Sequence, residues 1–153
     1  MTVCALLAAW ILLRPIVDGA AFVVRAADMH GIARTFAEIG IRAPREHEIA
    51  IPTARGPLHA RIYEPPRPRG RVALLTSGLH ASGIDEPRLV RLARDLSADG
   101  LVIVTPDIPE LSRFEITPAI TDAIERAGSW LARESGLAAD RRVGLMGISF
   151  SGG

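Results

Sequence analysis

The chain contains no lysine, asparagine or glutamine, and its one cysteine is Cys4. A single cysteine excludes an internal disulfide. Without lysine there is no Walker-type phosphate loop, which requires Gly-Lys-Ser/Thr. The 18 basic residues are balanced by 17 acidic ones, without a long run of either sign. This even charge gives no footprint for nucleic acid or for an anionic membrane surface. With 48% hydrophobic residues, the 153-residue chain has enough apolar surface for one ordinary domain.

Residues 1–30 form an apolar N-terminal segment. The stretch of residues 3–24 has the length of a membrane span, but a proline, Arg14 and Asp18 near its centre are costly in lipid. Its first half also matches the apolar core of a signal peptide, with a weak cleavage pattern after Ala21 and no basic residue in front. Three interpretations stay open: a membrane anchor, a cleaved export signal, or a helix packed on a cytoplasmic domain.

Residues 31–153 have the pattern of an α/β domain. The sequence predicts a hairpin, followed by apolar strands of the kind buried on both faces, with amphipathic helices between them. The predicted strands are 46–51, 58–63, 72–75, 101–104 and 142–146. The predicted helices are 31–39, one from 85–87 to Gly100, and one from 117–118 to Gly136. This alternation forms βαβ crossovers, so the last three strands are expected in a parallel sheet.

The residues with the most chemical information follow the last predicted strand. The sequence Gly147-Ile-Ser149-Phe-Ser151-Gly turns sharply at a serine after an apolar, β-prone run. Small residues two before and two after a serine are typical of a nucleophile elbow, although glycine is more usual than Ser151 at the second position. A shifted register would make Ser151 the nucleophile, with Gly153 after it. A plain strand–helix turn and a phosphate-cradling loop are the alternatives, because the spacing of a dinucleotide fingerprint is absent.

From residue 46 to 153 the chain resembles the N-terminal half of an α/β-hydrolase sheet. The resemblance implies antiparallel opening strands, then parallel βαβ units, and a truncation at the nucleophile elbow. Within that superfamily it is most similar to bacterial esterase, lipase and dienelactone-hydrolase-like proteins. The resemblance implies that Ser149 is the nucleophile and that the backbone N–H groups of Leu79 and Phe150 form the oxyanion hole. Ser77 stands where the family often has histidine.

The pattern offers no base for the serine. The family's triad runs in the order Ser, then Asp or Glu, then His, whereas all four histidines precede Ser149: His30, His47, His59 and His80. Without a base, a serine hydroxyl is a poor nucleophile at neutral pH. We therefore expect an N-terminal fragment that lacks the acid and the histidine, has an incomplete sheet and is inactive by itself. His80 is interpreted as an exposed or hydrogen-bonded loop residue rather than a catalyst.

No metal site and no cofactor are expected. Glu46 and Glu48 alternate with His47 along a predicted strand, so the carboxylates point away from the imidazole, and a charged edge strand explains them better. The favoured function is a serine hydrolase that cleaves an ester, thioester or amide of a small-molecule acyl substrate through an acyl-enzyme. The alternative is a non-catalytic α/β-hydrolase-like binding or scaffold module. A doubly wound protein that binds a phosphate-bearing ligand is the third hypothesis.

Overall fold

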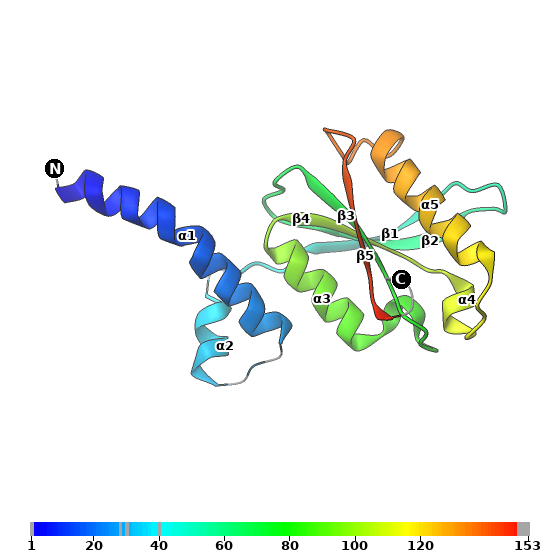
Figure 1. Cartoon of the computed structure of the whole chain (residues 1–153), viewed down its shortest axis with the longest axis horizontal. Coiled ribbons are helices and arrows are strands. Elements are labelled where there is room, and N and C mark those ends of the chain that lie inside the picture. The colour runs from blue at the N-terminus through cyan, green and yellow to red at the C-terminus, as the bar shows by residue number, and fades with distance from the viewer. Residues whose placement is uncertain (1, 28, 30, 40, 150–153) are drawn as a thin grey trace. The chain divides into compact units, whose positions relative to one another are not determined.

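The structure is a computed structural model that describes residues 2–27, 29, 31–39 and 41–149. The chain divides into two compact units, Met1–Ile41 and Arg42–Gly153 (Figure 1). The first unit consists of helices only, and the second contains the sheet. The residues singled out by the sequence for catalysis all belong to the second unit.

The first unit pairs helix α1 (Thr2–Ala26) with the short helix α2 (Ile32–Ala37). The buried side chain of Arg25 links them, because its Nη1 donates a hydrogen bond to the carbonyl oxygen of Ala37 at 2.9 Å. Nearer the N-terminus of α1, large apolar side chains such as Trp10 and Ile16 are exposed. None of the helices in the described part of the chain combines the length and apolar character needed to cross a membrane.

The second unit is built on a five-stranded sheet with the order β1-β2-β4-β3-β5 (Figure 1). The strands are β1 (Arg45–Ile51), β2 (Leu58–Glu64), β3 (Arg71–Thr76), β4 (Leu101–Pro106) and β5 (Val143–Gly147). β1 and β2 form the predicted hairpin, and β2 is also antiparallel to β4. β3 runs parallel to both β4 and β5. An antiparallel opening followed by parallel βαβ units confirms the predicted fold class.

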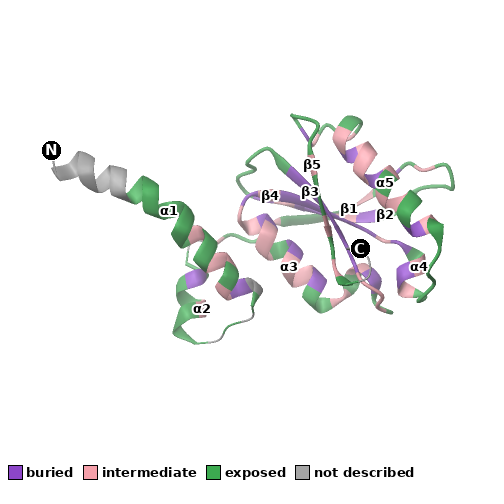
Figure 2. Ribbon diagram, in the orientation of Figure 1, coloured by how far each residue is buried: buried purple, intermediate pink, exposed green. Residues whose placement is uncertain are grey.

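Helices cover both faces of this sheet. Successive side chains of a strand point to opposite faces, so Leu74 and Leu75 belong to different apolar clusters. On one face α3 (Pro87–Ala98) buries Leu89, and on the other α5 (Pro118–Arg133) buries Leu131. Figure 2 shows the buried residues concentrated along β3 and β4, between these helices. The continuous apolar runs of the sequence therefore mark strands that are covered on both sides.

Two short elements lie outside the sequence prediction. They are the 3₁₀ helix η1 (Gly83–Asp85) and the helix α4 (Pro109–Ser112). Neither is long enough to show a hydrophobic period. α4 matters for the site nonetheless, because Leu111 and Ile108 pack with Ile120 in an apolar cluster that Leu79 also contacts.

The two edges of the sheet differ in chemistry. β1 begins with the charged residues Arg45 and Glu46, and the side chain of Arg94 donates two hydrogen bonds to Glu46, at 2.6 and 3.1 Å. Charges of this kind discourage further strands from pairing at an edge. β5 carries no charge, pairs only with β3 among the described strands, and leaves Leu145 65% exposed. The β5 edge therefore lacks the protection that the β1 edge has.

The burial of two leucines gives a first prediction. Leu131 is fully buried between α5 and the sheet, so Leu131→Ala should lower the free energy of unfolding by about 2–5 kcal/mol through lost burial and a residual cavity. Leu145→Ala is the matched control, and it should change the value by no more than about 0.5 kcal/mol. Urea unfolding followed by circular dichroism measures both. An equal loss for the two variants would contradict the exposure of Leu145.

Candidate active site

Ser149 lies two residues beyond the end of β5, in a backbone conformation that few residues adopt. Its φ is 57°, in the left-handed region where a side chain crowds the backbone. Strain of this kind persists only where the surrounding structure enforces it, and it concentrates at functional sites. Here the N–H of Ile148 donates to the carbonyl oxygen of Thr76 at 3.2 Å and holds the turn against β3. Ser149 is exposed at the tip of this turn.

The sheet register brings the two predicted catalytic loops together. β3 and β5 are parallel neighbours, and Thr76 at the end of one pairs with Gly147 at the end of the other. The loops that follow these two strands therefore leave the sheet side by side, at the carboxyl ends of the strands. Gly78 lies so close to the turn that an added Cβ would be 3.0 Å from the Ile148 carbonyl oxygen and 3.2 Å from the Ser149 Cβ. Only glycine fits at this approach without displacing the turn.

Of the two predicted oxyanion residues, the structure describes only Leu79. Leu79, directly after Gly78, is half-buried, and its side chain packs against the apolar cluster of α4 and α5. This packing fixes the loop from behind. Phe150 and the alternative nucleophile Ser151 lie outside the described residues. The positions of the two backbone donors relative to one another therefore stay a prediction.

A pocket of about 270 Å³ opens beside Ser149. The polar side chains in its lining come from Ser77, His80, Glu86, Arg88 and Ser149, and the apolar ones from Leu79, Leu89 and Ile148. It is formed by the loops after β3 and β5 and by the beginning of α3. A small ligand in this pocket would therefore lie next to Ser149.

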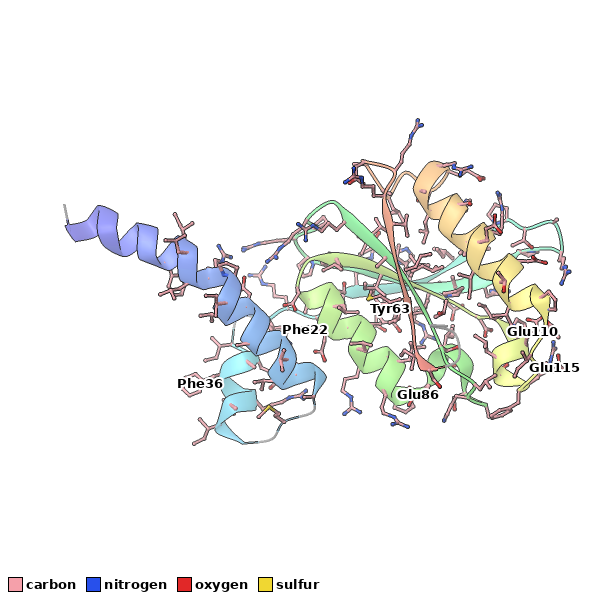
Figure 3. All side chains as sticks on the ribbon, in the orientation of Figure 1. Phe22, Phe36, Tyr63, Glu86, Glu110 and Glu115 are labelled. Carbon is pink, nitrogen blue, oxygen red and sulfur yellow. The ribbon has the colours of Figure 1, made fainter. Side chains whose placement is uncertain are left out.

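Glu86 holds the α3 wall of this pocket, and the sequence had identified it only as the start of a helix (Figure 3). It is the N-cap of α3: Oε2 accepts the Leu89 N–H at 2.7 Å, and Oε1 accepts from Arg88 Nε at 3.2 Å. Burial raises the pKa of this carboxyl, but the backbone N–H groups of Leu89 and Arg88 and the Arg88 guanidinium outweigh that effect. The pKa of Glu86 is consequently lower than its ordinary value.

His80 lines the same pocket, but its hydrogen bonding does not suit a general base. The N–H of Ser82 donates to His80 Nδ1 at 3.2 Å, so Nδ1 carries a lone pair. In the neutral imidazole the proton then resides on Nε2, which has no lone pair left to accept the Ser149 proton. The half-buried, hydrogen-bonded position agrees with the interpretation of His80 as a loop residue.

The other described histidines lie too far from Ser149 to accept its proton. His59 lies on β2, three strands from β5, and His47 lies on β1, four strands away. At a strand spacing of about 4.8 Å these separations are about 14 and 19 Å. His30 lies outside the described residues. Among the described side chains, moreover, no group of three His, Cys, Asp or Glu residues could hold a metal ion.

Among known proteins, the similarity of this chain is to solved structures. No family model matches it, and no curated protein matches it. The solved structures that match include an esterase from Pyrobaculum calidifontis, with a TM-score of 0.56 and 21% identity over 89% of this chain and 42% of that one. A dienelactone hydrolase from Anabaena variabilis matches with a TM-score of 0.58 and 21% identity, over 72% of this chain and 55% of that one. A carboxylesterase cloned from a metagenomic library matches with a TM-score of 0.52 and 24% identity, over 90% and 44%.

The fold is that of the α/β-hydrolases. The sheet order, the mixed strand directions and these neighbours agree with the resemblance that the sequence had indicated. The chain spans about half the length of the structures that it matches. The α/β-hydrolase resemblance is therefore to a portion of those proteins, and at these identities it concerns the fold.

The contact between Gly78 and the elbow gives the second prediction. Gly78→Ala should lower the free energy of unfolding by about 1–3 kcal/mol, because the new methyl group meets the Ile148 carbonyl and must push the two loops apart. Gly128→Ala is the matched control. Gly128 lies inside α5 with only an ordinary 3.5 Å contact to Leu145, so alanine should be neutral there or stabilise the helix by up to about 1 kcal/mol. Urea unfolding measures both variants. If Gly128→Ala were destabilised and Gly78→Ala were not, the close packing at Gly78 would be refuted.

The lowered pKa of Glu86 gives the third prediction. Its ionised form is favoured in the folded chain, so its contribution to stability is complete above the ordinary carboxyl pKa of 4.5 and is lost as pH falls through the lower folded value. Glu86→Gln should therefore be less stable than the wild type by about 0.3–1 kcal/mol at neutral pH. The difference should shrink towards zero in acid. A difference that stayed constant down to about pH 3 would exclude ionisation of Glu86 as the cause.

Proposed function

We propose that this chain belongs to a serine hydrolase that cleaves an ester, thioester or amide of a small-molecule acyl substrate through an acyl-enzyme. Ser149 is the proposed nucleophile. The observation that supports it most is the left-handed backbone of this exposed serine at the carboxyl end of β5, pressed against the glycine loop after β3. Phe114 and Arg141 also have a left-handed backbone and are exposed, so the support comes from the combination of this conformation with the place of Ser149 beyond β5 and against Gly78.

The proposed reaction has two stages. In the first, Ser149 Oγ attacks the carbonyl carbon of the substrate while a base takes its proton, and the leaving group departs with a proton from that base. In the second, water attacks the acyl-enzyme by the same route and releases the acid. The backbone N–H groups of Leu79 and Phe150 are proposed to stabilise the negative charge on the carbonyl oxygen. Loss of one such donor typically slows catalysis by about 100- to 1000-fold.

The general base and its acid partner are proposed to lie outside these 153 residues. His80, which shares the pocket with Ser149, uses Nδ1 to accept a hydrogen bond, and His47 and His59 are several strands away. Matched structures about twice as long as this chain are consistent with such an arrangement. We accordingly propose that residues 1–153 alone have no triad-level hydrolase activity.

One observation favours a different function, that of a non-catalytic binding or scaffold module with this fold. Among the described residues, we identify no general base for Ser149. His80 Nδ1 accepts the Ser82 N–H, and the Glu86 carboxylate caps α3. Such a module would keep the pocket and the turn but would have an unreactive serine. The two functions differ in one measurable property, the nucleophilicity of Ser149 in the whole protein.

The fourth prediction concerns that reactivity. In the whole protein, a fluorophosphonate probe should label the wild type, and Ser149→Ala should lose labelling and at least about 1000-fold of any p-nitrophenyl ester hydrolysis, because the attacking oxygen is gone. Mass spectrometry of the labelled peptide and initial rates measure the two effects. Ser151→Ala is the control that separates the two possible registers of the elbow, and it should keep both properties.

Two results would count against the proposal. Labelling that survived Ser149→Ala and vanished in Ser151→Ala would move the nucleophile to the other register. A folded whole protein that failed to label at all would favour the non-catalytic module.

A further inference from the structure

A second cavity, separate from the serine pocket, lies at the same end of the sheet, where the parallel strands finish. It has a volume of about 460 Å³ and shares no lining residue with the pocket beside Ser149. It is bounded by the turn between β1 and β2 and by helices α4 and α5. Because β2 is antiparallel to β4, Ala60 near the start of β2 pairs with Pro106 at the end of β4. This pairing brings the β1–β2 turn to the end of the sheet at which the parallel strands finish.

The walls of this cavity are mainly apolar. Pro57 contributes from the turn and Leu58 from the start of β2, Pro109 from α4, and Ala119 and Ala123 from α5. Ligand sites in proteins typically have volumes of about 300–1000 Å³, apolar walls and a few polar groups that orient the ligand. The cavity meets the first two criteria, so its polar groups determine which chemistry it accepts.

Both positive charges of the lining already have partners. The Arg126 guanidinium donates from Nε to the Pro52 carbonyl oxygen at 2.8 Å and binds Glu134 through Nη1 and Nη2 at 3.0 and 3.1 Å. Arg55 pairs with Asp122, which also lines the cavity, at 3.7 Å. An anionic ligand would therefore have to displace an existing carboxylate.

Glu110 is different from these paired groups (Figure 3). It lies on α4 and is half-buried, and among the described residues no ion pair or side-chain hydrogen bond involves its carboxylate. Its backbone carbonyl accepts the Glu115 N–H at 2.8 Å, which fixes the end of α4. The charge that is left unbalanced in the cavity is therefore the negative charge of Glu110.

We propose that this cavity binds a small organic cation, with an apolar body against Leu58, Ala119 and Ala123 and one ammonium group at Glu110. The proposal is independent of the reaction at Ser149. An ammonium–carboxylate contact in a half-exposed site contributes modestly, so the selectivity for a cation is expected to be several-fold. The apolar body is expected to supply the remaining affinity by burying its surface in the cavity.

The fifth prediction tests charge selectivity with three probes of similar size. 2-Phenylethylammonium should bind more tightly than 2-phenylethanol, and 3-phenylpropionate should bind most weakly; ligand-observed NMR titration measures the three dissociation constants. Glu110→Gln should weaken binding of the ammonium probe by about fivefold and leave the alcohol unchanged. Glu115→Gln is the matched control, because that carboxylate is outside the cavity and pairs with Arg113 at 3.2 Å. It should not alter any of the three constants.

Ala119→Phe locates the site. The larger side chain should fill the cavity and weaken binding of both the ammonium and the alcohol probes at least about tenfold, while thermal unfolding shows that the variant is folded. Selective loss on Glu110→Gln together with blockage by Ala119→Phe would support the proposal. Equal affinity for the three probes, an unchanged constant in Glu110→Gln, or no saturable binding of the ammonium probe would overturn it.

Discussion

The parallel pairing of β3 with β5 is the interaction on which the candidate site depends. Thr76 and Gly147 are register partners, so two loops separated by about seventy residues in sequence begin side by side. The N–H of Ile148 then bonds back to Thr76, and Gly78 lies within contact of the serine turn. A one-residue slip in this register would reverse the faces of the β5 side chains and separate the loops. The strained backbone of Ser149 lies two residues beyond the last pair of this register.

The apolar interior fixes that register from both sides. Leu74 and Leu75 face opposite clusters, one completed by α5 and the other by α3, so β3 is held on both faces. β5 is held less well, because Leu145 is largely exposed and no described strand pairs with its outer edge. The elbow thus follows a strand that is well anchored on one side only. The contrast with the charged, ion-paired β1 edge shows that this openness is not general to the sheet.

Much of the fold could be predicted from sequence because the signals are local. Four-residue apolar runs identified β3 and β4, and the Glu86-Pro87 pair identified the beginning of α3. The elements that were missed, η1 and α4, are too short to carry a hydrophobic period. The role of Glu86 in the pocket was missed for a different reason. Its helix-capping signal is explained by its own helix, whereas its proximity to Ser149 depends on the pairing of distant strands.

The short helix α4 contributes to two features at the carboxyl end of the parallel strands that the sequence treats as unrelated. Leu111 and Ile108 pack with Ile120 of α5 and with Leu79, the residue proposed to donate to the oxyanion. The outer side of the same helix presents Pro109 and Glu110 to the second cavity. Because protein interiors are close-packed, a shift of α4 would move both Leu79 and the wall of the second cavity. The loop that carries Leu79 and the second cavity therefore share α4 as an apolar support. This helix has only four residues and shows no hydrophobic period, yet both features depend on its position.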